Sequence, residues 1–256
     1  MRDSGAVTST AALVRAERLA AGYGGAPVLR GVTFTLRPGE RVGVLGPNGG
    51  GKTTLFRVLM GELEPLAGTL EAPGRFGVVP QTERSRLDFP VSALDVSLMG
   101  SLSTLPWWRR PGRAERRAAR EALAAVGLED LAGATFGDLS GGQRQRVLVA
   151  RALVQDASVI LLDEPFTGLD NPSVERLEAL LDDLASEGRG LMIATHDVDQ
   201  AREWDRVLCL NREQVAFGEP AAILDRAVLE ATYGGDIVEL PGDHDHGVLP
   251  PHHHHH

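Results

Sequence analysis

Lysine is almost absent from this 256-residue chain: lysine and arginine together number 26, and Lys52 is the only lysine. Cysteine is equally scarce, and the lone Cys209 cannot form a disulfide within the chain, which suits a reducing compartment. No stretch approaches the roughly 20 apolar residues of a membrane-spanning helix, and the N-terminus lacks the pattern of a signal peptide. We therefore expect any role at a membrane to be exercised through a partner.

An excess of positive charge is also lacking. The formal net charge is −9 at pH 7, which argues against nucleic acid as a partner. Hydrophobic residues make up 43% of the chain and charged residues 24%, values that fit a soluble globular enzyme. The length is sufficient to bury a substantial core in one large or two small domains.

The single lysine lies in a glycine-rich motif. Residues 46–53 match the pattern G-x-x-x-x-G-K-[ST], with an apolar run at 42–45 before it and a segment with helical spacing of apolar residues after it. This order of strand, loop and helix is the setting that a phosphate-binding loop requires. The predicted ATP-binding residues are Gly46, Pro47, Asn48, Gly49, Gly50, Gly51, Lys52, Thr53 and Thr54.

Each part of this loop has a physical role in binding phosphate. Successive glycines let the backbone curl, so that its N–H groups converge on the β- and γ-phosphates. The helix that begins near Gly51 adds the positive end of its dipole. Lys52 supplies positive charge, and the hydroxyl of Thr53 can ligate Mg²⁺.

Two acidic residues follow a short, wholly apolar run. Residues 159–162 read Val-Ile-Leu-Leu, as expected for a strand covered on both faces, and Asp163 and Glu164 come next. Asp163 is placed to reach the Mg²⁺, and Glu164 is placed to orient or deprotonate the attacking water. A polar strand end without a catalytic role is the alternative, which the phosphate-binding loop earlier in the chain disfavours.

A third motif precedes an apolar-periodic helix and reads Leu139, Ser140, Gly141, Gly142, Gln143. Ser140 and Gln143 have the spacing of a capping box, so the motif could simply be a well-capped helix. Consecutive glycines weaken the first turn of a helix. Their presence is better explained if a phosphate approaches this backbone closely.

Local patterns predict an α/β nucleotide-binding core that is interrupted by a helical insert. Strands are expected at about 14–23, 28–36, 42–45, 76–79, 159–162, 191–194, 207–210 and 214–217. Helices are expected at about 92–100, 113–126, 141–155 and 175–184.

Together the motifs resemble those of the nucleotide-binding subunit of ATP-binding-cassette (ABC) transporters, over roughly residues 15–235. The resemblance implies a P-loop NTPase (RecA-like) core with an antiparallel β subdomain and an inserted α-helical signature subdomain at about 88–155. The ATPase domain would cover 15–238, after a flexible N-terminus at 1–14 and before a histidine-rich disordered tail at 239–256.

The resemblance also implies roles for single residues. Residues 139–143 match the family's signature sequence, Tyr23 matches the aromatic residue that stacks on adenine, and Asp170 matches the D-loop aspartate. Gln81 matches the Q-loop glutamine, which contacts Mg²⁺ and water. His196, the only histidine before the C-terminal tail, matches the switch histidine that contacts the γ-phosphate. The implied catalytic residues are Lys52, Gln81, Glu164 and His196, with Mg²⁺ held by Thr53, Gln81 and Asp163.

Two positions depart from the family pattern. Gly50 stands where alanine is common, and residues 167–170 read Thr-Gly-Leu-Asp where Ser-Ala-Leu-Asp is usual. Neither change removes a catalytic group, although the sequence at 167–170 does not determine the detailed geometry of the D-loop.

The resemblance implies several partners. In this family each nucleotide lies between the P-loop of one subunit and the signature of another, and this chain has one of each. A second copy of the chain is therefore expected, together with an integral-membrane permease and, indirectly, a solute-binding protein. The assembly would lie on the cytoplasmic face of a prokaryotic cell membrane, without nucleic acid.

The region from Val79 to Pro111, which includes Trp107 and Trp108, resembles the manganese/zinc/iron importer subfamily. Another cargo, such as an iron chelate or cobalamin, is an alternative. A soluble ABC ATPase of DNA repair or ribosomes is a third, but the chain has no coiled-coil insertion, second cassette or overall basic character.

Two further segments are open to interpretation. His244, His246 and the run 252–256 could chelate a transition metal, but a purification tag or a disordered tract also explains them, so no functional metal site is predicted. Residues 109–120 contain six arginines and could face acidic lipid or the permease. A solvated helix face fits that pattern better.

Overall fold

The computed structural model describes residues 11–73, 75–81, 90–103, 105–234, 238–239 and 248–249. The predicted N-terminal segment and histidine-rich tail fall largely outside these ranges, so their disorder stays a prediction. Among the described residues, no helix has the length and apolar character that crossing a membrane demands.

The central sheet has six strands, which are β3 Arg41–Leu45, β5 Gly77–Val79, β6 Val159–Asp163, β7 Gly190–Thr195, β8 Arg206–Leu210 and β9 Gln214–Gly218. They lie in the order β5-β6-β7-β3-β8-β9, and all neighbours are parallel except β8 and β9. Parallel strands place their carboxyl ends at one edge of a sheet. The segments that follow β3, β6 and β7 therefore meet at that edge.

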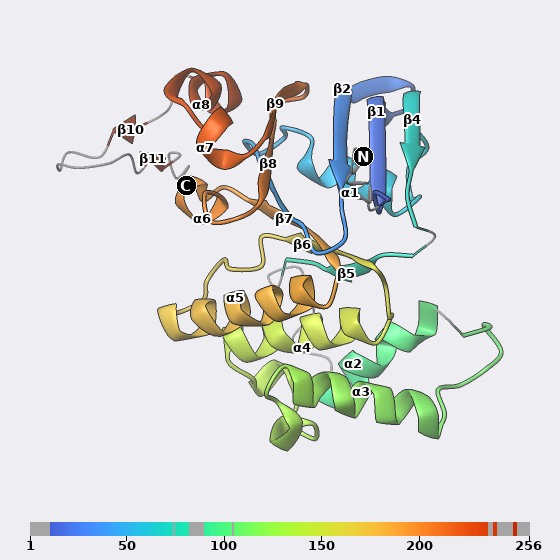
Figure 1. Cartoon of the computed structure of the whole chain (residues 1–256). Helices are drawn as coiled ribbons and strands as arrows, with labels where there is room; N and C mark the ends of the chain where they lie inside the picture. Colours follow the sequence, from blue (N-terminus) through green and yellow to red (C-terminus); the bar gives the residue numbers. More distant parts are fainter. Residues whose placement is uncertain are drawn as a thin grey trace, which may run out of the picture.

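A second, antiparallel sheet is formed by β1 Val14–Tyr23, β2 Ala26–Leu36 and β4 Ala67–Glu71, in the order β2-β1-β4. The buried residues of β1 and β2 pack with α1, Lys52–Leu59, against one face of the central sheet. Figure 1 shows this sheet beside β8 and β9 in the upper part of the molecule.

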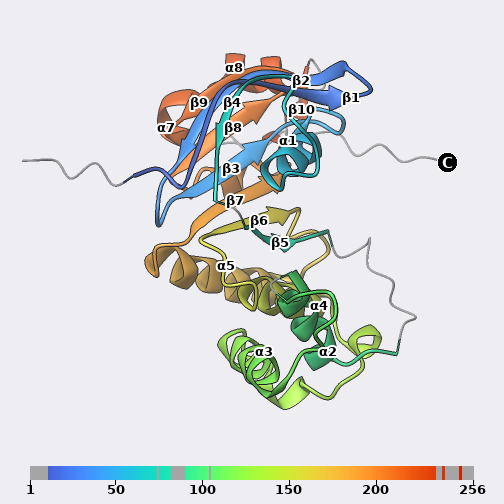
Figure 2. The same ribbon diagram turned by 90° about the vertical axis from the view of Figure 1, so that its right-hand side faces the viewer.

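A helical layer covers the other face. Its elements are α2 Ala93–Leu98, η2 Met99–Ser103, α3 Arg113–Ala125, η3 Glu129–Leu131, η4 Phe136–Asp138, α4 Gly141–Leu153 and α5 Asn171–Ser186. All but α5 lie between β5 and β6 in the sequence, and Figures 1 and 2 show the layer below the sheet. In β6, Val159 and Leu161 join the cluster around α1, whereas Ile160 and Leu162 join the cluster under the helices. This confirms the prediction of a strand covered on both faces.

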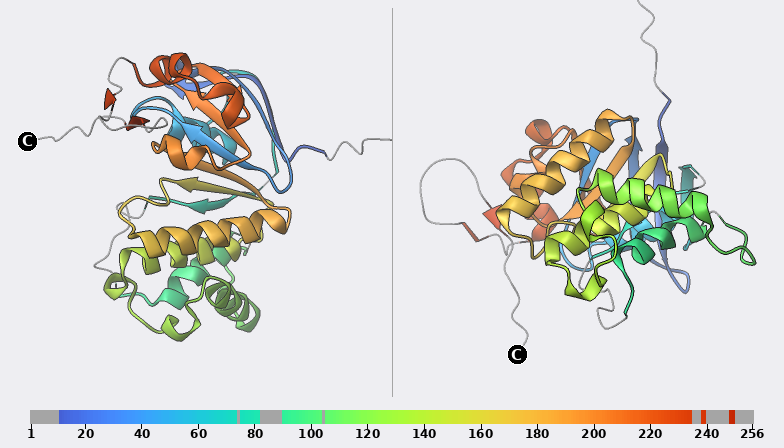
Figure 3. Two further views of the ribbon diagram at one scale, coloured as in Figure 1. Left: turned by 60° about the vertical axis from the view of Figure 1, so that its left-hand side comes forward. Right: turned by 90° about the horizontal axis from the view of Figure 1, so that it is seen from below.

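The remaining elements follow β7 and β9. They are α6 Val198–Ala201, α7 Pro220–Ile223, α8 Arg226–Tyr233 and a two-residue pair of β10 Val238–Glu239 with β11 Val248–Leu249. Figure 3 shows α7 and α8 at the opposite end of the molecule from α3.

The fold class predicted from the sequence is confirmed. The elements β4, α6, α7 and α8 were not predicted, and some predicted elements have shifted ends. The helix expected at 175–184 begins at Asn171, because Asp170 ends the extended backbone and Pro172 suits a first helical turn. The helix expected at 92–100 ends at Leu98 and continues as the 3₁₀ turn η2. Neither change alters the order of the elements.

The two glycines at the start of α4 have different surroundings. A Cβ atom at Gly142 would lie 2.3 Å from Oγ and 2.7 Å from Cβ of Ser173, so α4 and α5 approach each other too closely there for a side chain. At Gly141 the nearest atom outside its own helix, the carbonyl oxygen of Gly168, would be 3.6 Å from a Cβ. Packing thus supplies a reason for Gly142 that is independent of phosphate.

This difference gives a prediction for stability. Gly142→Ala should lower the free energy of unfolding by about 1–3 kcal/mol, because overpacking forces α4 and α5 apart. Gly141→Ala, the matched control, should change it by less than about 1 kcal/mol. Urea denaturation measures both values. Equal stability of the two variants would show that Ser173 does not limit residue 142.

Candidate nucleotide-binding site

The loop between β3 and α1 has a backbone that only glycine adopts readily. Gly49 and Gly51 have φ angles of 77° and 104°, in the left-handed region. At Gly46 a Cβ atom would lie 2.2 Å from the carbonyl oxygen of Leu210, so β8 supports the loop from behind. The loop is therefore held in a fixed curl before α1 begins at Lys52.

Gly50, one of the two departures from the family pattern, has a local explanation. Its amide donates a hydrogen bond to the carbonyl of Pro47 at 3.0 Å, and its carbonyl accepts one from Arg212 at 2.9 Å. A Cβ atom at Gly50 would lie 2.9 Å from the oxygen of Pro47 and 3.1 Å from that of Leu210. In this chain the loop leaves too little room for alanine.

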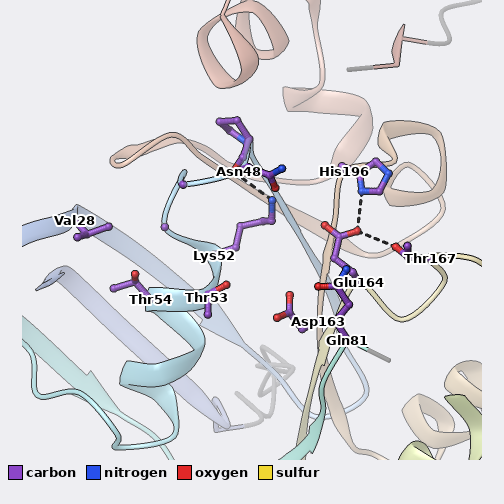
Figure 4. Close-up of a pocket in the computed structure, with 13 residues that line it drawn as sticks. Val28, Asn48, Lys52, Thr53, Thr54, Gln81, Asp163, Glu164, Thr167 and His196 are labelled. Carbon is purple, nitrogen blue, oxygen red and sulfur yellow. Dashed lines mark hydrogen bonds and ion pairs between the residues drawn. The ribbon is translucent and has the colours of Figure 1, made fainter. Parts of the chain in front are cut away.

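Lys52 is buried at the first position of α1. Its ammonium donates hydrogen bonds to the carbonyl of Gly46 and, at 3.4 Å, to that of Pro47. Burial lowers the pKa of Lys52, and the charges of Glu164 and Asp163 oppose that decrease. The charge of Lys52 thus lies inside the loop, opposite two carboxylates (Figure 4).

Glu164 occupies a strained backbone conformation directly after β6. Its φ angle is 51°, and its amide donates to the carbonyl of Ala194 at 3.0 Å. A left-handed conformation in a residue other than glycine costs about 1–3 kcal/mol and is often found at functional sites. It turns the carboxylate toward Thr167 and His196 rather than along the strand (Figure 4).

A short hydrogen bond joins Glu164 to His196. Nδ1 of His196 lies 2.7 Å from Oε2 of Glu164, which also accepts a bond from Oγ1 of Thr167 at 3.3 Å. The bond to Glu164 raises the pKa of His196, against the effects of burial and of Lys52. Burial alone would raise the pKa of Glu164, but the hydrogen bond and charge of His196, with Lys52 and Thr167, lower it overall. Glu164 is therefore ionised at neutral pH.

These side chains share one pocket of about 280 Å³ with most of the predicted site residues. Figure 4 shows residues from α1 on one side and residues that follow β5, β6 and β7 on the other. The pocket is lined by Val28, Pro47, Asn48, Gly49, Gly51, Lys52, Thr53, Thr54, Gln81, Asp163, Glu164, Thr167 and His196. Sequence reasoning missed Val28 and Thr167. Val28 belongs to no motif, whereas Thr167 lies within one turn of Glu164 and could have been found by that spacing.

The pocket also offers donors for a hard cation. The hydroxyl of Thr53, the amide of Gln81 and the carboxylate of Asp163 line it together. Such oxygen donors are those that Mg²⁺ prefers. The residues present therefore fit that ion.

The other predicted site residues lie outside this pocket. Tyr23 is 46% exposed at the end of β1, with the guanidinium of Arg57 5.8 Å from its ring centroid. The signature residues 139–143 lie at the start of α4, where the side chains of Ser140 and Gln143 form the predicted capping box. Asp170 immediately precedes α5. None of these residues lines the pocket that contains Lys52 and Glu164.

Comparison with known proteins agrees with this geometry. A family model described as "ABC transporter" matches residues 29–167. The chain is 35% identical over 234 residues to a manganese transport system ATP-binding protein of Halalkalibacterium halodurans, covering 88% of this chain and 93% of the relative. It is 38% identical over 240 residues to a zinc transport system ATP-binding protein of Treponema pallidum, covering 90% of each.

Solved structures give the same result. A putative metal-chelate type ABC transporter in an inward-facing conformation superposes with a TM-score of 0.81 at 31% identity, over 94% of this chain and 98% of that one. An ATP-binding cassette solved as a dimer with ADP and phosphate superposes with a TM-score of 0.66 at 26% identity, over 81% and 98%.

The chain therefore belongs to the ABC transporter family. It is a nucleotide-binding ATPase subunit of a transport complex.

The bond between Glu164 and His196 gives a prediction for titration. Glu164→Gln removes the carboxylate that raises the pKa of His196, so that pKa should fall. The pKa of His196 is higher in the folded state than in the unfolded state. Protonated His196 therefore stabilises the fold fully at pH values below its unfolded pKa of about 6.5, and this stabilisation is lost as the pH rises through the folded pKa. NMR titration of the imidazole, assigned with His196→Gln, measures the shift. Asp199→Asn is the control, and an unchanged pKa in Glu164→Gln would contradict the assignment.

Proposed function

We propose that this chain hydrolyses ATP to power the import of a divalent metal cation of the manganese, zinc or iron type. The observation that carries the proposal is the near full-length similarity to the manganese and zinc transport subunits, at 35% and 38% identity. The pocket of the P-loop, Asp163, Glu164 and His196 supports the ATPase chemistry.

The loop residues bind the phosphates in this proposal. Backbone N–H groups of the curled loop and the first turn of α1 point toward the anion. Lys52 exchanges the carbonyls of Gly46 and Pro47 for phosphate oxygens, because a charged acceptor is the stronger partner. Tyr23, at the exposed end of β1, stacks on the adenine.

Glu164 is the general base. It is ionised, and its backbone conformation directs it into the pocket, where it can accept a proton from the attacking water. The bond from water oxygen to the γ-phosphorus forms as the bond to the β,γ-bridging oxygen breaks, leaving ADP and phosphate. His196 holds the carboxylate through the 2.7 Å hydrogen bond and contacts the γ-phosphate.

Thr53, Gln81 and Asp163 would hold Mg²⁺. When bound, the ion neutralises charge that develops on the phosphate oxygens. Gln81, which follows β5, also lies near the contact with the permease in this proposal.

Two copies of the chain form the working unit, with the signature of one copy completing the site of the other. This is supported by the signature's lying outside the chain's own pocket and by the dimeric cassette among the similar structures. Ser140 and Gly142 of one copy then face the nucleotide of the other, and Asp170 lies at the junction. The dimer binds an integral-membrane permease at the cytoplasmic face of a prokaryotic membrane, and a solute-binding protein delivers the cation.

Substitution of the base tests the function directly. Glu164→Gln should retain ATP binding and lose hydrolysis by at least about 100-fold, because proton transfer contributes 10²–10⁴. In a strain that lacks the natural gene, the wild-type chain should restore uptake of radioactive manganese or zinc, and Glu164→Gln should not. Wild-type turnover by the variant would exclude the assigned base. Normal ATPase activity without restored uptake of either metal would refute the cargo alone.

Mixed dimers test the shared site. Ser140→Arg and Lys52→Ala should each be inactive, but a mixed dimer keeps one intact site, formed by Lys52 of one copy and Ser140 of the other. Random pairing of equal amounts then restores about a quarter of wild-type ATPase, if the two sites act independently. If verified mixed dimers are as inactive as the parents, the two copies do not share the site.

An iron chelate is the second candidate cargo. It is supported by the 31% identity to the putative metal-chelate type transporter and by 35% identity to a chelated iron transport protein of Yersinia pestis, over 79% of this chain and 72% of that one. Uptake of chelated iron, but not of free manganese or zinc, would favour it.

A further inference from the structure

The largest concentration of exposed apolar side chains lies outside the nucleotide site. Six large hydrophobic residues are exposed among the described residues, and four of them fall between positions 99 and 108: Met99, Leu102, Trp107 and Trp108. The two tryptophans are 92% and 72% exposed. Their rings meet edge to face, with centroids 5.8 Å apart. Exposure of two adjacent tryptophans to water is costly enough to require an explanation.

An arginine face follows this tryptophan pair in the chain. Arg113, Arg116, Arg117 and Arg120 are exposed and have the spacing i, i+3, i+4, i+7, so they lie along one side of α3. An adjoining side of the helix buries Ala119, Ala122 and Leu123. Arg117 meets Glu121 at 3.5 Å. In the part of the chain that the structure describes, no ion pair joins the other three arginines to a carboxylate.

Glu115 ties the turn that carries the tryptophans to the start of α3. Its carboxylate accepts a hydrogen bond from the amide of Gly112 at 2.7 Å and one from the guanidinium of Arg109 at 3.2 Å. The amide of Arg109 in turn donates to the carbonyl of Pro106 at 2.9 Å. The segment before α3 is thus bonded to the first turn of α3. Figure 1 shows it projecting at the outer edge of the helical layer, away from the sheet.

We propose that this Trp–Arg surface, made of Trp107, Trp108, Arg113, Arg116, Arg117 and Arg120, binds the anionic lipid headgroups of the membrane. The proposal rests on the proposed location of the chain at a membrane. It replaces the solvated helix face that the arginine pattern alone favours, because the two exposed tryptophans add an apolar anchor. Tryptophan rings prefer the headgroup level, and arginines near an anionic leaflet are attracted to it. Because the chain as a whole carries −9, an anionic surface repels most of it. This surface would therefore orient the protein.

Lipid fits these features better than a protein partner does. The tryptophans stand on a projecting segment, as their exposures show, rather than in a groove that a partner could fill. A protein partner would need acidic groups spaced to match the row of arginines. An anionic membrane carries its negative charge uniformly over its surface, so it needs no such match. The surface is also separate from the nucleotide pocket, since none of its residues lines it. Its loss should therefore leave basal ATPase activity unchanged.

Vesicle binding tests the proposal. The purified full-length chain is mixed with phosphatidylcholine vesicles that contain or lack phosphatidylglycerol, at pH 8, where histidines with the ordinary pKa of about 6.5 are neutral. We expect binding to the anionic vesicles only, weakening as salt rises. Arg113→Gln with Arg120→Gln should weaken it by about fivefold per arginine. Arg15→Gln with Arg30→Gln, the matched change of charge on the β1–β2 sheet, should not.

The tryptophans need a second pair of variants. Trp107→Ala with Trp108→Ala should abolish sedimentation with anionic vesicles, whereas Leu66→Ala, another exposed apolar residue, should not. The Glu164→Gln variant should bind vesicles as the wild-type chain does. Vesicle binding therefore tests the lipid proposal separately from the proposed ATPase function. Absence of binding to anionic vesicles, or equal binding by all variants, would overturn the proposal. So would tryptophan-dependent binding only to phosphatidylcholine vesicles that carry the permease, which would identify a protein partner.

Discussion

Parallel pairing of β7 with both β3 and β6 is the constraint on which the nucleotide site depends. The register sets Leu45 beside Thr195 and Asp163 beside Ala194. The P-loop, Glu164 and His196 are the next residues along their strands, so backbone hydrogen bonds bring them to one edge of the sheet. The amide of Glu164 bonds to the carbonyl of Ala194, which ties the base to the strand that carries His196. The hydrogen bond between the two side chains follows from this register.

Charge within the pocket is divided between its two sides. Lys52 is buried, which lowers its pKa, and it bonds to the carbonyls of its own loop while Asp163 and Glu164 favour its charged form. The pocket thus presents a cation and a backbone cradle on one side and carboxylates on the other (Figure 4). A nucleoside triphosphate with Mg²⁺ matches that division, because its phosphates meet the lysine side and its Mg²⁺ meets the carboxylates.

The sequence predicted most of this pocket because the catalytic groups follow strands in short motifs. A glycine loop, two acids at the end of a strand and a histidine after a buried strand are local signals, and residues from all three line one pocket. Val28 was missed because its contact with the pocket depends on how separate segments meet, whereas Thr167, three residues after Glu164, could have been found from the local spacing. Gly142 was interpreted through phosphate alone, since nothing local indicates that Ser173 occupies the space beside it. The start of α5 was placed four residues late because apolar periodicity begins after the first turn.

By itself the sequence determined the family, the six strands of the central sheet and the residue types of the phosphate site. The requirements for glycine, lysine and acidic residues are imposed by backbone geometry and charge over a few residues. Only the tertiary structure decided which distant groups touch. It paired Glu164 with His196, crowded Gly50 against Pro47 and Leu210, and kept the signature out of the chain's own pocket. The physical reason is that strand register and helix packing, unlike motifs, are fixed by contacts between segments far apart in the chain.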